Sequence, residues 1–96
     1  MSKVNKQSVD LENIRREIDS LDQAIQELIS ERARLAFRVR ESKATAKGAI
    51  EYFRPEREAQ VLRGVLDRNQ GPLSDSEMLR LFREIMSACL AQQEPL

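Results

Sequence analysis

The sequence contains no histidine and a single cysteine, Cys89, among its 96 residues. Histidine is the commonest general base and the commonest metal ligand, so neither kind of chemistry has its usual side chain here. One cysteine excludes an internal disulfide framework and a thiolate metal cluster, and it favours a reducing compartment. We therefore predict no metal and no cofactor, and any catalysis must depend on arginine, lysine, carboxylates and amides.

Turn-forming and aromatic residues are also scarce. Three glycines, three prolines, one tyrosine and no tryptophan are too few for a small all-β domain. No run approaches the roughly 18 apolar residues of a membrane span, and the opening MSKVNKQSVD lacks the apolar stretch of a signal peptide. Sixteen Lys and Arg balance sixteen Asp and Glu, so no overall field attracts nucleic acid or an anionic membrane. We predict a cytoplasmic protein.

A long amphipathic helix is predicted over about residues 11–45. Residues 1–9 are polar and without periodicity, which predicts a flexible leader before a single domain over 10–96. Asp10 is placed to cap the helix, and neither glycine nor proline follows until Gly48. Apolar residues then recur at alternating three- and four-residue spacing. This apolar seam consists of Leu11, Ile14, Ile18, Leu21, Ile25, Leu28, Leu35 and Val39.

Two shorter helices are predicted after it. Pro55 suits the first position of a helix over about 55–69. Ser74 and Glu77 have the spacing of a capping box, which predicts a third helix over about 75–93. The predicted fold class is therefore all-α with three helices.

The first helix is too long for its own domain to cover. About 35 residues at ~1.5 Å each make a rod of about 52 Å, against a diameter of roughly 32 Å for a compact domain of this size. Exposed apolar seams normally mark partner surfaces, and twofold dimers are the commonest oligomers. We predict an intertwined homodimer; the alternative is a solitary helical hairpin with a frayed end.

Three cations on this helix are candidates for binding an anion. Arg32 occupies a seam position that should be apolar, and Lys43 projects from nearly the same face about 16 Å further on. Arg15 lies about 25 Å before Arg32, so in an antiparallel dimer it could reach the partner's site. The alternatives are a snorkelled Arg32 and solvated side chains at the other two positions.

Four polar or reactive residues stand out in the shorter helices. Arg57 and Glu58 open the second helix, where first-turn surface charge is the simpler interpretation. Gln93 continues the apolar stripe of the third helix, which places an amide inward unless that end frays. Cys89 lies on the same stripe and is most simply a small core residue. Together with the cations, these residues are typical of a site for a small dianion.

Four segments of the chain closely resemble the all-helical chorismate mutases. They are IRREIDSLD (14–22), LISERARLAFRV (28–39), PEREAQVL (55–62) and LFREIMSACLAQQ (81–93). The resemblance covers about residues 10–93, with the motifs in order. It is closest to the mutase domain of the bifunctional chorismate mutase–prephenate dehydratase proteins, and such a domain can be one part of that longer chain.

This resemblance implies an intertwined dimer with two active sites, which rearranges chorismate to prephenate for phenylalanine and tyrosine biosynthesis. It implies conformational restraint and electrostatic stabilisation without covalent or acid–base catalysis. Two alternatives remain open: an enzyme like isochorismate pyruvate lyase, and a non-catalytic dimeric regulatory module.

The resemblance also implies roles for individual residues. Arg15 would reach across the dimer, and Arg32 would bind a substrate carboxylate within its own chain. Lys43 would contact a carboxylate and the ether oxygen, and Gln93 would also contact that oxygen.

Four further positions would contact the ring side of the substrate. Arg57 and Glu58 match the family pair that opens the second helix, with the glutamate at the ring hydroxyl. Arg54 stands where the family often has Asp, and Cys89 stands where it often has Ser. These two departures affect the ring-side contacts more than the cationic part of the site.

Overall fold

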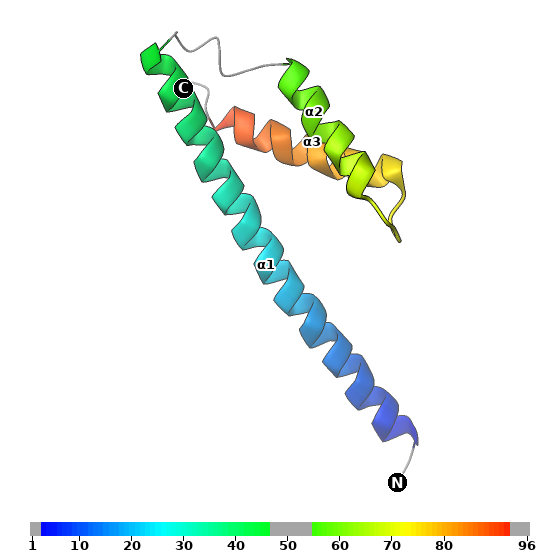
Figure 1. The fold of residues 1–96 in the computed structure, drawn as a ribbon. Helices are drawn as coiled ribbons and strands as arrows, with labels where there is room; N and C mark the ends of the chain where they lie inside the picture. The colour runs from blue at the N-terminus through cyan, green and yellow to red at the C-terminus, as the bar shows by residue number, and fades with distance from the viewer. Residues whose placement is uncertain (1–2, 47–54, 93–96) are drawn as a thin grey trace. The chain divides into compact units, whose positions relative to one another are not determined.

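The computed structural model describes residues 3–46 and 55–92, and within them the side chains of residues 10–42 and 55–92. The described chain forms three helices and no strand (Figure 1). They are α1 (Lys3–Ala46), α2 (Pro55–Arg68) and α3 (Asp75–Ala91). The predicted all-α class with three helices is confirmed.

Helix α1 begins earlier than the sequence pattern predicts. Its first residue is Lys3, so Asp10 lies inside the helix and the prediction that Asp10 is the N-cap is wrong. The segment before Asp10 contains no glycine or proline, so no residue there stops the helix from extending towards the N-terminus. The predicted C-terminal end is confirmed to within one residue, because α1 ends at Ala46, two residues before Gly48. The domain boundary at residue 10 stays a prediction.

The chain divides into two compact units, the first ending at Glu31 and the second beginning at Arg32. In the first unit α1 carries six residues of the apolar seam, all of them exposed. Their exposed fractions run from 48% to 63%, for Leu11, Ile14, Ile18, Leu21, Ile25 and Leu28. An apolar stripe with about half or more of each residue exposed to water is typical of a surface that a partner covers.

In the second unit α2 and α3 pack on each other as a helical hairpin (Figure 1). Each contributes one buried hydrophobic residue to the described interior, Val65 from α2 and Cys89 from α3. Pro55 is the first residue of α2, as predicted, and Glu56 and Glu58 lie in its first turn, where the helix dipole favours anions. The hairpin thus places the start of α2 and the end of α3 away from the connecting loop.

The loop between α2 and α3 is organised by one side chain. Asn69 donates from Nδ2 to the Leu73 carbonyl oxygen (3.0 Å) and to Asp75 Oδ1 (2.8 Å), while its Oδ1 accepts from the Gly71 backbone N–H (3.3 Å). Gly71 has a φ of 79°, a left-handed conformation that glycine adopts without steric cost. These contacts explain why the helix ends where the Asn–Gln–Gly–Pro sequence begins.

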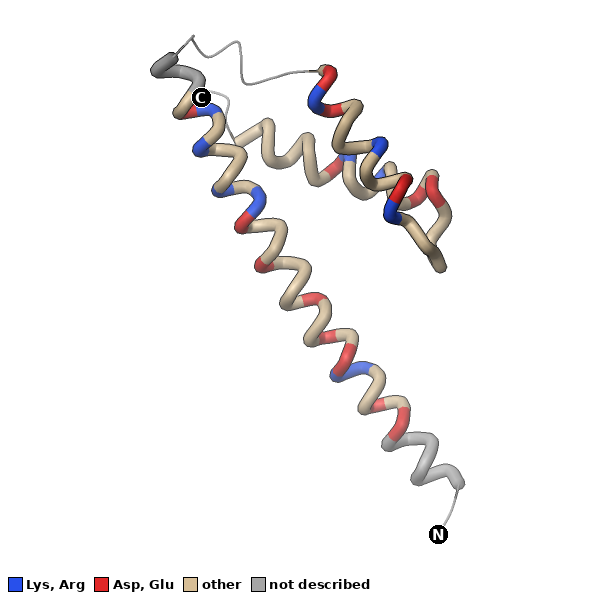
Figure 2. The backbone as a smooth tube through the Cα atoms, viewed as in Figure 1, with Lys and Arg blue, Asp and Glu red and all other residues tan. Residues whose placement is uncertain are grey.

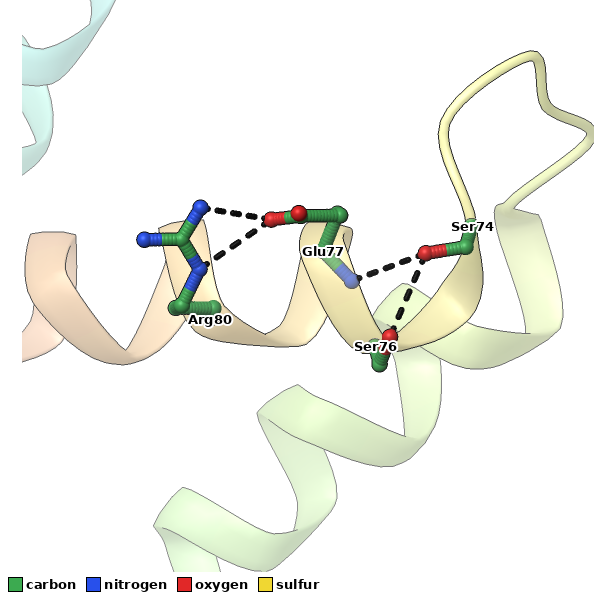
Figure 3. A network of polar contacts seen from close by, with 4 residues as sticks. All are labelled: Ser74, Ser76, Glu77 and Arg80. Carbon is green, nitrogen blue, oxygen red and sulfur yellow. Dashed lines mark hydrogen bonds and ion pairs between the residues drawn. The ribbon is translucent and has the colours of Figure 1, made fainter.

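The predicted cap of α3 is confirmed in one of its two halves. Ser74 Oγ accepts from the Glu77 backbone N–H at 3.2 Å and also contacts Ser76 Oγ (Figure 3). The Glu77 carboxylate instead accepts two hydrogen bonds from Arg80, from Nε at 3.1 Å and from a terminal nitrogen at 2.6 Å. Hydrogen bonding to Glu77 raises the pKa of Arg80, so any stability gained from this charge is fully present at pH 7 and does not vary with pH there.

None of the described helices combines the length and apolarity needed to cross a membrane. The cytoplasmic location inferred from the sequence stays a prediction.

Candidate active site

Arg32 is partly covered, in contrast to the seam residues on either side of it. It lies in α1 four residues after Leu28 and three before Leu35, both of which are more than half exposed, and its own side chain is half-buried. The stripe of α1 therefore contains one guanidinium at a position that its period reserves for an apolar side chain. Partial burial is expected both for a snorkelled arginine and for a cation that meets an anion at an apolar surface, so anion binding by Arg32 stays a prediction.

The end of α3 is hydrogen-bonded to α1 beside Arg32. Gln92 is the C-cap residue of α3, and its Nε2 donates a hydrogen bond of 2.6 Å to the backbone carbonyl oxygen of Ala33. The two residues are 59 positions apart in the chain. The bond therefore joins the residue after Arg32 to the residue before Gln93.

Sequence reasoning missed Gln92, although a signal for it exists. Gln92 and Gln93 follow Cys89 by three and four residues, and both spacings keep a side chain on one face of a helix. Periodicity alone cannot choose between the two glutamines. Gln93 and Arg54 lie outside the described residues, and Lys43 is described only as part of the α1 backbone.

The first turn of α2 holds both residues that were predicted there. Arg57 and Glu58 are exposed, and a terminal nitrogen of Arg57 donates to Gln60 Oε1 at 3.4 Å. This bond within α2 directs the guanidinium along its own helix. The surface-charge interpretation accounts for both residues in the single chain, and their contact with the substrate ring stays a prediction.

Cys89 is buried in α3, with 3% of its surface exposed and a free thiol. Its burial matches that of Val65 on α2, so in the single chain it is a small interior residue. The contact of Cys89 with the ring side of the substrate, which the resemblance implied, stays a prediction.

Arg15 lies in the first unit, exposed on α1. The neighbouring Arg16 is engaged on its own helix, where it donates to Asn13 Oδ1 at 2.7 Å and forms an ion pair with Glu12 at 3.9 Å. The side chain of Arg16 is therefore bonded to residues one turn earlier in its own helix. The predicted role of Arg15 across a dimer stays a prediction.

Residues 10–42 and 55–92 contain no group of three or more acidic, cysteine or histidine side chains that could hold a metal ion. The candidate residues whose side chains the structure describes carry guanidinium groups (Arg15, Arg32 and Arg57), one carboxylate (Glu58) and one thiol (Cys89). Such a set can bind and orient an anion through hydrogen bonds.

Comparison with known proteins identifies the family. The sequence profile of the chorismate mutase type II family matches residues 14–94. A bifunctional chorismate mutase/prephenate dehydratase of Stutzerimonas stutzeri is 52% identical over 89 residues, which are 90% of this chain and 24% of that protein. The protein of the same name from Pseudomonas aeruginosa has the same identity and coverage, and that of Neisseria gonorrhoeae is 50% identical over 82 residues.

The chain spans about a quarter of the length of these relatives, since the matched residues make up 22–24% of each relative. Their identity to it is nevertheless spread over 85–90% of this chain. The chain belongs to the chorismate mutase type II family, which confirms the family resemblance seen in its motifs.

Proposed function

We propose that the chain rearranges chorismate to prephenate in a site that two copies of the chain build together. The observation that carries this proposal is the extent of the family match. Every residue proposed for the site, from Arg15 to Gln93, lies inside the matched segment 14–94.

The reaction suits the side chains available. One C–O bond breaks as one C–C bond forms within a single molecule, and no proton is transferred, so the absence of histidine is no handicap. The substrate has to be folded into its compact conformer, and charge that develops on the ether oxygen has to meet fixed donors. Conformational restraint and electrostatics are therefore sufficient.

In this proposal, guanidinium groups hold the substrate in its compact conformer. Two other donors stabilise the charge that develops on the ether oxygen. Arg32 and the partner's Arg15 bind carboxylates through planar forks of N–H donors. Lys43 and Gln93 meet the ether oxygen. A hydrogen bond to a charged group contributes about 1.5–3 kcal/mol, and each ~1.36 kcal/mol removed from the barrier raises the rate tenfold.

The exposed apolar seam of α1 supports the proposal that a second copy of the chain binds there. Its residues are about half in water in the single chain, so a stable protein gains by burying them against another apolar seam. A second chain is the economical occupant because it carries the same seam.

The charges along α1 support an antiparallel arrangement of the two copies (Figure 2). Acidic residues predominate over residues 10–31 and basic residues over residues 32–42. The acidic set is Asp10, Glu12, Glu17, Asp19, Asp22, Glu27 and Glu31, and the basic set is Arg32, Arg34, Arg38 and Arg40. Antiparallel pairing sets the acidic part of each helix against the basic part of the other, whereas parallel pairing sets like charges together.

A mixing experiment tests the shared site. Arg15→Ala and Arg32→Ala each remove one guanidinium from every site of their own homodimers, so each variant alone should lose most of its chorismate turnover. A mixed dimer contains one site with both arginines and one with neither. After unfolding together and refolding at equal concentrations, activity should return to about one quarter of wild type, because half of the dimers carry one intact site of two.

Two outcomes would refute parts of this proposal. A wild-type protein that leaves chorismate absorbance unchanged would refute the activity. Single variants that are inactive and remain so after mixing, in a preparation whose size is that of a dimer, would refute the sharing of the site.

The relatives' names pair a mutase with a prephenate dehydratase. We extend the proposal accordingly: the prephenate formed here is consumed by a dehydration on the route to phenylalanine. Coupling the purified chain to a separate prephenate dehydratase should give the dehydrated product from chorismate, and either protein alone should not.

A further inference from the structure

We propose that Gln92 is a positioning residue, which holds the end of α3 against α1 so that Gln93 and Arg32 act on the same substrate molecule. This inference rests on the proposed function, because it gives Gln92 a role only through those two residues. It starts from the hydrogen bond of 2.6 Å between Gln92 Nε2 and the Ala33 carbonyl oxygen.

The bond connects two backbones next to the proposed catalytic groups. Ala33 directly follows Arg32, and Gln92 directly precedes Gln93. A carbonyl oxygen has two lone pairs, so Ala33 can accept from Gln92 without leaving the hydrogen-bond ladder of α1. A single side chain thus fixes the separation of two chain segments that are 59 residues apart in sequence.

The place of Gln92 in α3 makes such a tie necessary. The helix ends at Ala91, and the C-cap Gln92 is held by a backbone hydrogen bond of 3.4 Å to the Ala88 carbonyl oxygen. Helix ends fray, so a C-cap residue is held more firmly when its side chain is also hydrogen-bonded. Because Gln93 follows Gln92 directly in the chain, we infer that holding Gln92 also restricts where Gln93 can lie.

The expected effect is on the chemical step. The proposed Gln93 donor acts on charge that develops in the transition state, so a misplaced donor lowers kcat more than it raises KM. A displacement of about 1 Å in a reacting geometry can cost about a hundredfold in rate. A side chain that only stabilised the fold would also lower apparent kcat at unchanged KM, through a smaller active fraction, so kcat is expressed per folded chain, with the folded fraction measured by circular dichroism.

The test compares four variants of the whole chain in chorismate turnover. Gln92→Ala removes the donor and should lower kcat about tenfold or more, with KM within about twofold of wild type. Gln92→Glu keeps the shape but replaces the donor with an acceptor, and it should show the same loss. Gln92→Lys restores a donor of similar reach and should recover most of kcat. Gln70→Ala, at an exposed glutamine in the α2–α3 loop, should match wild type.

The results separate this inference from the proposed function. A wild-type protein without turnover overturns both. A wild-type protein with turnover, alongside Gln92→Ala and Gln92→Glu with unchanged kcat, overturns the positioning role alone. Equal losses in Gln92→Lys and Gln92→Glu also overturn it, since a donor would then not be what matters. If Gln92→Ala does not fold, the comparison of Gln92→Glu with Gln92→Lys decides.

Discussion

The side-chain amide of Asn69 donates a hydrogen bond of 2.8 Å to the carboxylate of Asp75, which joins the end of α2 to the first residue of α3. The same amide bonds the Leu73 carbonyl oxygen and accepts from the Gly71 N–H. Asn69→Ala removes all three bonds, each worth about 0.5–1.5 kcal/mol. We expect the free energy of unfolding to fall by about 1.5–4.5 kcal/mol in urea titrations.

Gln70→Ala is the control for this loss, because Gln70 lies in the same loop with its side chain exposed. A change at Gln70 should leave unfolding within about 0.5 kcal/mol of wild type. Equal stabilities for the two variants would show that the loop does not depend on the Asn69 side chain.

Lys43→Ala tests the proposed donor to the ether oxygen. It removes a charged hydrogen bond worth about 1.5–3 kcal/mol in the transition state, so kcat/KM for chorismate should fall about tenfold to a hundredfold or more. The variant should keep its size in solution. Arg63→Ala removes a cation from the exposed surface of α2 and should retain wild-type activity. Near wild-type turnover in Lys43→Ala would refute the role of the lysine.

Chorismate and isochorismate should be assayed side by side with the same preparation. We expect chorismate to be consumed without release of pyruvate. Release of pyruvate from isochorismate, at a higher rate than chorismate is consumed, would instead favour the lyase-like alternative.

Leu21→Ala distinguishes a covered seam from a solvated one. Leu21 is 62% exposed in the single chain. Truncating an exposed leucine changes the free energy of unfolding by no more than about 0.5 kcal/mol. Truncating a leucine that is buried in a dimer interface lowers the free energy of unfolding by about 2–5 kcal/mol. We expect the larger loss in thermal unfolding, together with weaker association on size-exclusion chromatography. Leu73→Ala, at a leucine 46% exposed in the α2–α3 loop, is the matched control. Equal small losses in both would contradict the dimer.

Cys89→Ser introduces the residue that the family often has at this position. Only 3% of Cys89 is exposed, and a hydroxyl buried without a partner costs about 1–3 kcal/mol. We therefore expect lower stability in urea unfolding. Unchanged stability combined with a lower KM for chorismate would instead show that the side chain contacts the substrate.

Local chemistry explains which parts of the fold were predictable from sequence. Pro55 and Ser74 fix the starts of α2 and α3 through the backbone geometry and hydrogen bonds of a few neighbouring residues, so both starts were predicted correctly. Asp10 has the composition of a cap, but no helix-stopping residue precedes it, and α1 continues to Lys3. Glu77 could bond either the Ser74 N–H or Arg80, and it bonds the guanidinium, which is charged.

The candidate site was predictable only in part. Arg32 was identifiable because a cation interrupts a regular apolar stripe. The bond from Gln92 to Ala33 was not identifiable from sequence, because it joins residues 59 positions apart. Local periodicity does not predict contacts at that separation. The roles of Arg15 and Cys89 depend on a second chain or on substrate, which neither periodicity nor the fold of one chain determines.

The exposed seam of α1 makes protein concentration part of the energetics. Val65 and Cys89 are the buried hydrophobic side chains among the described residues, so a lone copy has little interior to oppose the entropy of unfolding. If pairing supplies the rest, melting temperature rises with the logarithm of the amount dissolved, and turnover per molecule declines on dilution. Variants of this protein are therefore comparable only at matched molarity.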